Sequence, residues 1–238
     1  RFAALGDYFY GTNVTNIGGI TPEKSMGIDF GVDKYFEELG LDLSLTAFLV
    51  QYDDHIAGWA SNVNEKGNTF AVKNSAGEIK NKGIEVATGK LLSGGYNLSL
   101  NYAYTDSLDG EDCDNPDRTT KSPTDCQGVL VPKHQISSSL KKTIDNFEGL
   151  GDLNLTLNTN YVGERRDYGN VNTSIYHAGY SGTFHDVILG DYITFDILSN
   201  IKINDKVYFM NLKNALTAEY ETGYMYRGQE RMLNFGVK

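Results

Sequence analysis

The sequence predicts an all-β chain whose long antiparallel strands cross a membrane as part of a β-barrel. Several stretches alternate apolar and small polar residues over about nine or more positions, as in 96–105 and 153–161. A period of two over such a length indicates a strand with one apolar and one polar face. Soluble strands usually run about five or six residues, whereas tilted membrane strands need about nine to eleven. Strand length therefore favours a membrane barrel.

The expected strands follow one another as hairpins. Their approximate ranges are 24–36, 41–53, 77–92, 96–105, 133–144, 153–161, 193–203, 207–212 and 232–237. The odd-numbered connections are short, as in Glu37–Gly40, the glycine turn Ser93–Gly95 and the two-residue turn Asn204-Asp205, while the even-numbered ones are long. Glycine suits the positive φ of a hairpin turn. Short periplasmic turns alternating with long extracellular loops are typical of outer-membrane barrels.

Composition restricts the alternatives. No stretch approaches 18 apolar residues, which excludes a membrane-spanning helix. A mean hydropathy of -0.38 is compatible with a barrel, because half of each strand faces a polar lumen. The net charge of -10, with scattered basic residues, argues against nucleic-acid binding. A soluble β-sandwich or jelly roll remains the alternative, but its connection lengths have no reason to alternate.

A polar loop from Ser107 to Val131 contains both cysteines, Cys113 and Cys126. We expect a disulfide between them, since exposed thiols oxidise outside the cytosol, and two unpaired thiols are the alternative. Closing this loop would stabilise the fold by roughly 3 kcal/mol. Acidic residues in the same loop could chelate Ca²⁺, although their spacing favours a solvated acidic loop. They are Asp109, Glu111, Asp112, Asp114 and Asp117.

Five segments, in order along the chain, resemble the C-terminal barrel of TonB-dependent outer-membrane transporters. The segments are Thr21–Ser25, Asn74–Ile79 with Lys82–Glu85, Val131–Gln135, Asn160–Arg165, and Asn211–Leu216 followed by Tyr220-Glu221. The run from Tyr220 to Tyr224 is most similar to the cobalamin and siderophore receptors of that family.

This resemblance implies a 22-stranded barrel filled by an N-terminal plug. Residues 1–238 would then be the last nine or so strands, with 1–23 as an extracellular segment before the first complete strand. The first strands, the plug and its energy-coupling segment would precede Arg1. The family's barrels end on an aromatic residue, so we expect a few residues beyond Lys238.

The resemblance also implies a function, namely active uptake of a bulky, scarce nutrient across the outer membrane, energised by the TonB complex. An iron-siderophore complex is the first expected cargo, cobalamin the second and an oligosaccharide the third. Outer-membrane lipid and the TonB complex are the expected partners. We expect no catalysis, cofactor or resident metal. Haem is disfavoured, because residues 5–25 contain no His to pair with the motif at Arg1–Ala4. The rivals are a passive porin, a soluble carbohydrate-binding β-sandwich and an outer-membrane hydrolase.

Aromatic residues of the long connections are the candidate ligand contacts. They are Trp59, Tyr168, Tyr176, Tyr180 and Tyr224. An aromatic girdle or loop packing is the alternative for each. His177 and His185, in the connection from about Asp167 to Ile188, are expected to be solvated rather than metal ligands.

Overall fold

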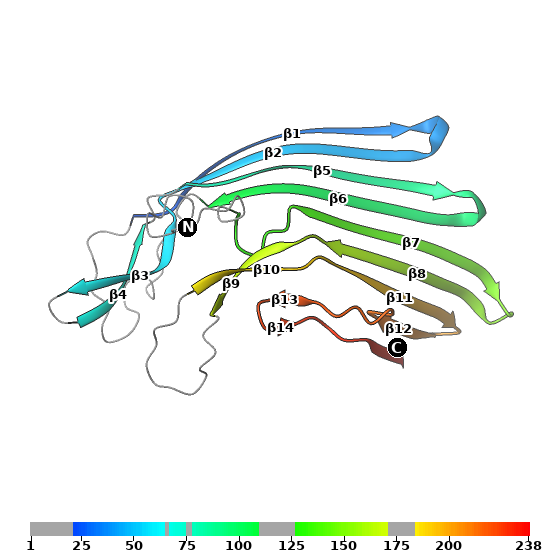
Figure 1. The fold of residues 1–238 in the computed structure, drawn as a ribbon. Helices are drawn as coiled ribbons and strands as arrows, with labels where there is room; N and C mark the ends of the chain where they lie inside the picture. Colours follow the sequence, from blue (N-terminus) through cyan, green and yellow to red (C-terminus); the bar gives the residue numbers. More distant parts are fainter. Residues whose placement is uncertain (1–20, 65–66, 75–77, 110–126, 171–183) are drawn as a thin grey trace. The chain divides into compact units, whose positions relative to one another are not determined.

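In the computed structural model the residues that the structure describes form one nine-stranded antiparallel sheet and three small two-stranded sheets (Figure 1). The structure describes residues 21–64, 67–74, 78–109, 127–170 and 184–238. The large sheet has the order β1-β2-β5-β6-β7-β8-β11-β12-β15, so its consecutive strands are neighbours in a meander. Its strands are β1 (Lys24–Phe36), β2 (Leu41–Asp53), β5 (Ile79–Leu92), β6 (Tyr96–Asp109), β7 (His134–Phe147), β8 (Gly151–Val162), β11 (Tyr192–Ile203), β12 (Lys206–Lys213) and β15 (Met232–Val237).

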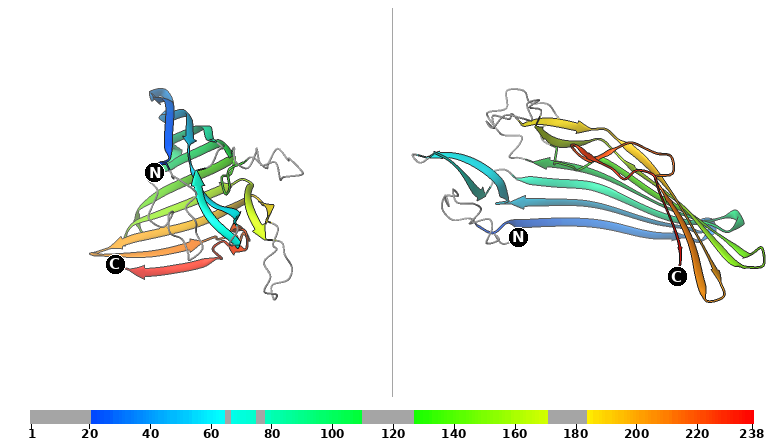
Figure 2. Two further views of the ribbon diagram at one scale, coloured as in Figure 1. Left: turned by 90° about the vertical axis from the view of Figure 1, so that its left-hand side faces the viewer. Right: turned by 90° about the horizontal axis from the view of Figure 1, so that it is seen from below.

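The prediction of an all-β antiparallel fold is confirmed, and the nine expected strands correspond one to one with those of the large sheet (Figure 2). The strand ends differ in places. β7 runs on to Phe147 and β8 begins at Gly151, so their connection is shorter than expected. A register shift between Ile144 and Phe147 breaks the simple alternation there, which hid this part of β7 from a period-two reading.

The register aligns the apolar residues of neighbouring strands in rows. Directly opposed residues of antiparallel strands point to the same face. One row crosses six strands and consists of Leu98, Leu140, Leu157, Ile197, Leu212 and Leu233. The opposite face carries polar rows, such as Ser99, Ser139, Asn158 and Asp196. The alternation read within single strands is therefore continuous across the sheet.

The apolar face is not covered by protein. Few apolar side chains whose burial is described are buried, among them Ile56 and Leu189. Leu157, in the middle of β8, is 38% exposed, and Phe235 in β15 is 78% exposed. A soluble sandwich would instead bury such rows between two sheets. In the part of the chain that the structure describes, no helix is long and apolar enough to cross a membrane.

Glycines shape the short turns as the sequence predicts. The short 3-10 helix Glu37–Leu39 ends at Gly40 with a φ of 55°, and Gly94 has a φ of 77° in the turn between β5 and β6. L-residues with a side chain rarely adopt these values. Asn204, in the two-residue turn between β11 and β12, has a φ of 54°, which asparagine tolerates better than most residues.

The long connections were predicted as loops, and this prediction is wrong where three of them form small hairpins. They contain the hairpin of β3 (Ile56–Asn64) and β4 (Gly67–Asn74), the hairpin of β9 (Arg165–Asn170) and β10 (Phe184–Leu189), and the short pair β13 (Glu221–Gly223) and β14 (Tyr226–Arg227). Strands with water on both sides need no apolar alternation, so periodicity does not reveal them.

The chain divides into two compact units. The first comprises 1–29, 48–82 and 106–128, and the second comprises 30–47, 83–105 and 129–238. In the first unit, side chains hold the base of the β3–β4 hairpin: the Glu23 carboxylate accepts a hydrogen bond from the Ile56 N–H at 2.9 Å, and the Asn74 amide donates to the Thr21 carbonyl at 2.9 Å.

Candidate functional site

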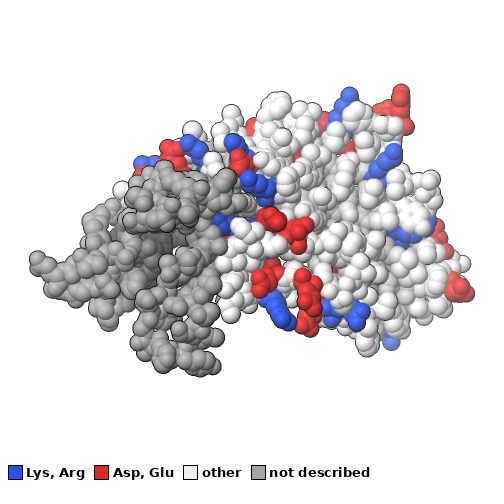
Figure 3. Space-filling view, in the orientation of Figure 1, with Lys and Arg blue, Asp and Glu red and all other residues white. Residues whose placement is uncertain are grey.

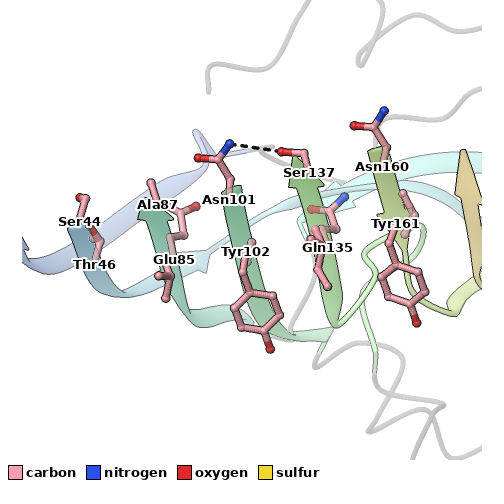
Figure 4. Close-up of a pocket in the computed structure, with 14 residues that line it drawn as sticks. Ser44, Thr46, Glu85, Ala87, Asn101, Tyr102, Gln135, Ser137, Asn160 and Tyr161 are labelled. Atoms are coloured by element: carbon pink, nitrogen blue, oxygen red, sulfur yellow. Dashed lines mark hydrogen bonds between the residues drawn. The ribbon is translucent and has the colours of Figure 1, made fainter. Parts of the chain in front are cut away.

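A shallow hollow of about 400 Å³ lies within the second unit, along the strands β2, β5, β6, β7 and β8 (Figure 4). On its polar side it is lined by Ser44, Thr46, Glu85, Ala87, Asn101, Ala103, Gln135, Ser137, Asn160 and Val162. In Figure 4 the amides of Asn101 and Asn160 point to the side opposite the rings of Tyr102 and Tyr161. This separation follows from the two parities of each strand.

Side-chain hydrogen bonds link the polar face across strands. Asn101 Nδ2 donates to Ser137 Oγ at 3.3 Å, and nearer the short turns Thr143 Oγ1 donates to Asn154 Oδ1 at 2.8 Å. Asn154 Nδ2 in turn donates to Asn200 Oδ1 at 3.2 Å. The side chains that form these bonds are uncharged. The same face also carries carboxylates, including Glu85 in the hollow and Asp196 in β11.

The last long connection, residues 214–231, folds onto this polar face. A second hollow, of about 270 Å³, is lined by Asn160, Thr194 and Asp196 of the strands together with Asn214, Tyr220 and Gln229 of the connection. The connection thus covers the wall at β8 and β11.

Asn214 fixes the start of this connection. It is buried, with 3% of its surface exposed, and has a φ of 45°. Its side-chain amide donates to the carbonyls of Ala218 and Gln229 at 2.8 and 2.9 Å, and its oxygen accepts from the Ala218 N–H at 2.9 Å. Its own N–H donates to Asp196, whose carboxylate also pairs with Lys213 at 2.9 Å.

Arg165 and two tyrosines hold the middle of the connection. The rings of Tyr192 and Tyr220 stack with centroids 4.1 Å apart, and the Arg165 guanidinium lies 5.1 Å from the Tyr192 centroid. Arg165 is buried, and it donates to the carbonyls of Gly163 and Glu221. A buried guanidinium needs such acceptors, because losing hydration costs several kcal/mol.

The segments that carry the family resemblance supply these buried contacts. Gly163, from Asn160–Arg165, allows close approach of the His134 backbone: its N–H donates to the His134 carbonyl at 2.8 Å, and an added Cβ would lie 3.0 Å from that oxygen. His134 belongs to the segment Val131–Gln135, and Asn214 to Asn211–Leu216. These motifs therefore lie where strands end and the connections begin, and their residues bond the two together.

Of the aromatic residues predicted as ligand contacts, Tyr224 is described in most detail. It is half-buried in the turn of β13 and β14, and its N–H donates to the Asp167 carboxylate at 2.6 Å. Trp59 lies in β3 and Tyr168 in β9, while Tyr176 and Tyr180 lie outside the described residues. The structure does not test a ligand role for any of them.

The remaining predicted sites fall largely outside the described residues. Cys113 and Cys126 do so, as does His177, and so does the acidic loop apart from Asp109 at the end of β6. His185 lies in β10. Within the described ranges, no group of three or more His, Cys, Asp or Glu side chains could hold a metal ion.

Sequence reasoning missed Arg165, Tyr192, Asp196 and Asn214 as organisers of this region. Arg165 and Asn214 lie inside motifs that indicate only the family resemblance. Asp196 lies in the expected strand 193–203, where the alternation assigns it a polar face and no further role. Several of their contacts join residues 17 to 56 positions apart, and no local pattern encodes such pairs.

Comparison with known proteins identifies the family. Residues 1–219 match the family described as TonB dependent receptor-like, beta-barrel. The chain belongs to this family. Its place is the outer membrane, where the uncovered apolar face of such a barrel meets lipid. Comparison with curated proteins gave no match.

Solved structures of TonB-dependent receptors share the fold at low identity. The FrpB iron transporter of Neisseria meningitidis is 16% identical with a TM-score of 0.67, over 94% of this chain and 32% of that one. The pyoverdine receptor FpvA of Pseudomonas aeruginosa is 18% identical with a TM-score of 0.65, over 92% and 30%. The ferric yersiniabactin receptor FyuA of Yersinia pestis is 18% identical with a TM-score of 0.60, over 90% and 29%. The chain spans about a third of the length of these proteins.

Proposed function

We propose that the protein is an outer-membrane receptor that actively imports an iron-siderophore complex, energised by the TonB system. The observation that carries this proposal is the family match over residues 1–219 together with the uptake roles in the names of the similar structures, an iron transporter, a pyoverdine receptor and a ferric yersiniabactin receptor. The geometry gives support, since a polar wall of hydrogen-bonding side chains faces away from the apolar rows.

Within this proposal the described strands are barrel wall, the last nine or so of a 22-stranded barrel, and residues 1–23 belong to an extracellular segment. The polar wall would contact a plug domain, because a row of hydrogen-bonding side chains suits a polar filling better than a lipid one. Trp59, Tyr168, Tyr176, Tyr180 and Tyr224 remain our candidates for ligand contact. A bridge between Cys113 and Cys126 would rigidify the connection that holds them.

Growth under iron limitation tests the proposed function. A strain lacking the full-length gene should lose growth on particular ferric siderophores in chelated medium and regain it from a plasmid copy. Uptake of radioactive iron presented on the same siderophore should stop when a protonophore collapses the inner-membrane gradient. Unchanged growth on every siderophore, with lost growth on cobalamin, would replace the cargo by cobalamin. Uptake insensitive to the protonophore would favour a passive porin.

A further inference from the structure

The apolar face of the strands carries lysines near both ends, and the two sets differ in their partners. In the first unit, at the long-connection end, each of the three is paired with a carboxylate: Lys24 with Asp54 at 2.9 Å, Lys80 with Glu78 at 2.5 Å and Lys82 with Asp106 at 3.3 Å. In the second unit, near the short turns, the lysines that share strand positions with the apolar face are Lys34, Lys90, Lys142 and Lys206.

None of these four short-turn lysines forms an ion pair in the part of the chain that the structure describes. Their place on the apolar face follows from parity and register. Lys34 shares the parity of Phe30 and Val32 in β1, and Lys90 that of Ile84 and Val86 in β5. In the strand register, Lys142 lies opposite Tyr96 and Leu155, and Lys206 lies opposite Ile203.

Carboxylates at this end of the strands are directed elsewhere. In those parts of the large sheet that belong to the second unit, no strand position on the apolar face holds Asp or Glu. Acidic residues near the short turns either lie in the turns or have the polar parity. Those in the turns are Glu37, Glu38, Glu148 and Asp205, and those of polar parity are Asp33, Asp42, Asp145 and Asp152. The apolar face here is therefore basic, with no acidic side chain of its own.

The two lysines with described ring contacts show how the ammonium groups are held. Lys34 Nζ lies 4.7 Å from the Phe36 ring centroid, and Lys142 Nζ lies 5.0 Å from that of Tyr96. Lys142 also donates to the carbonyl of Gly94, in the turn between β5 and β6. Both ammonium groups thus lie against an aromatic ring that borders a short turn. Lysines at membrane interfaces extend their charged ends towards the headgroups in this way. In Figure 3 charged side chains of both signs lie at the right-hand end, where Figure 1 shows the short turns, and a mostly uncharged surface lies next to them.

We propose that these four lysines form a binding surface for the headgroups of anionic phospholipids in the leaflet that meets the short turns. The strands supply no carboxylate to these lipid-facing ammonium groups, and the net negative charge of anionic headgroups is the complementary charge available near the short turns. A basic residue near an anionic leaflet gains about 1 kcal/mol, which corresponds to roughly a fivefold preference. The long-connection lysines need no such lipid, because each has a carboxylate partner.

A local fluorescence measurement on the full-length protein tests the proposal. With Trp59 and any other native tryptophan replaced by phenylalanine, a tryptophan placed in the outer face beside Lys142, by Leu155→Trp, reports which lipid lies there. The protein is reconstituted in phosphatidylcholine with increasing fractions of phosphatidylglycerol, and either lipid is brominated in turn. The ratio of quenching by the two brominated lipids gives the local preference. We expect a preference for phosphatidylglycerol that Lys142→Gln and Lys142→Met each lower about fivefold, and that Lys142→Arg retains.

Lys141→Gln is the matched control, because Lys141 is the adjacent residue of β7 with the opposite parity, paired with Asn97 and Thr156. It should leave the preference unchanged. Folding of every variant is checked by its heat-dependent mobility in detergent gels. Equal quenching by both lipids in the parent, or equal losses from Lys141→Gln and Lys142→Gln, would overturn the proposal. Loss of the preference on adding millimolar inorganic phosphate would show a phosphate site rather than a lipid one, and would also overturn it.

Discussion

The strand wall and the last long connection, residues 214–231, are stabilised in different ways. In the wall, side chains project alternately to two faces, and its apolar rows remain uncovered by protein. Its order comes from the backbone ladder and, in the membrane, from lipid on one side. The connection has only the five ladder residues of β13 and β14, and it depends on a few buried polar groups around Asn214, Arg165 and Tyr220. In the wall, the effect of a substitution should therefore depend on which face of the sheet the side chain occupies. In the connection, it should depend on which hydrogen-bond or stacking partner is lost.

The largest effect is expected from a charge in the middle of the apolar face. Leu157 lies midway along β8, in the row with Leu140 and Ile197. Leu157→Arg should lower the free energy of unfolding by about 2–4 kcal/mol, because an arginine near the bilayer midplane loses its hydration. Urea unfolding in lipid vesicles measures this. Asn158→Arg, on the polar face, is the control, and an equal loss from both would contradict the assigned facing.

The depth of a residue sharpens the same test. The sequence alone predicts that Leu155→Arg lowers the free energy of unfolding by about 2–4 kcal/mol if Leu155 lies near the midplane. The register pairs Leu155 with Lys142, close to the turn between β7 and β8. Its substitution should therefore cost less than Leu157→Arg in the same vesicles.

The next effect concerns the start of the connection. Asn214→Ala removes three side-chain hydrogen bonds in a buried site and places alanine at a positive φ. Leaving buried backbone groups unpaired costs about 1–3 kcal/mol, so the connection should open locally. Hydrogen exchange at the Ala218 amide should accelerate accordingly. Thr217→Ala, whose exposed hydroxyl bonds only the neighbouring carbonyl of Leu216, should leave that amide as protected as before.

A smaller effect is expected where the rings of Tyr220 and Tyr192 stack. Tyr220→Leu should destabilise the connection by about 0.5–1.5 kcal/mol through loss of the aromatic pair. Tyr220→Phe keeps the stack and loses only the bond accepted from the Gln229 N–H, so its cost should be lower. Limited proteolysis within 214–231 ranks the two variants. Faster cleavage of Tyr220→Phe than of Tyr220→Leu would show that stacking is not the main contact.

The smallest effect belongs to a short turn of the wall. Gly40→Ala should cost about 1 kcal/mol, the lower end of the cost of a left-handed conformation for an L-residue, because φ is 55° and no atom lies within 4 Å of the added methyl. The loss is conformational and not steric. Gly190→Ala, also in open space and without a positive φ, should be neutral. Equal urea midpoints for both variants would argue against strain at Gly40.

The strands of the wall could be predicted from the sequence, because the alternation of apolar and polar residues that defines them lies within each strand. Period-two alternation located nine strands, and glycine or Asn-Asp pairs marked their short turns. The hairpin of β3 and β4 could not be found in this way, since strands outside the bilayer have no dry face to create a pattern. The contacts around Arg165 and Asn214 could not be predicted from the sequence either. They depend on register and on the approach of distant segments, which one sequence does not display.

The central claim is that one face of the sheet meets hydrocarbon and the other meets an aqueous lumen. Nitroxide labels on Leu157→Cys and Asn158→Cys, in full-length protein with Cys113 and Cys126 replaced by serine and reconstituted in vesicles, test it most directly. We predict that the label at 157 collides more with dissolved oxygen and the label at 158 more with a water-soluble nickel chelate. Equal accessibility at both positions, or the reverse order, would contradict the assignment.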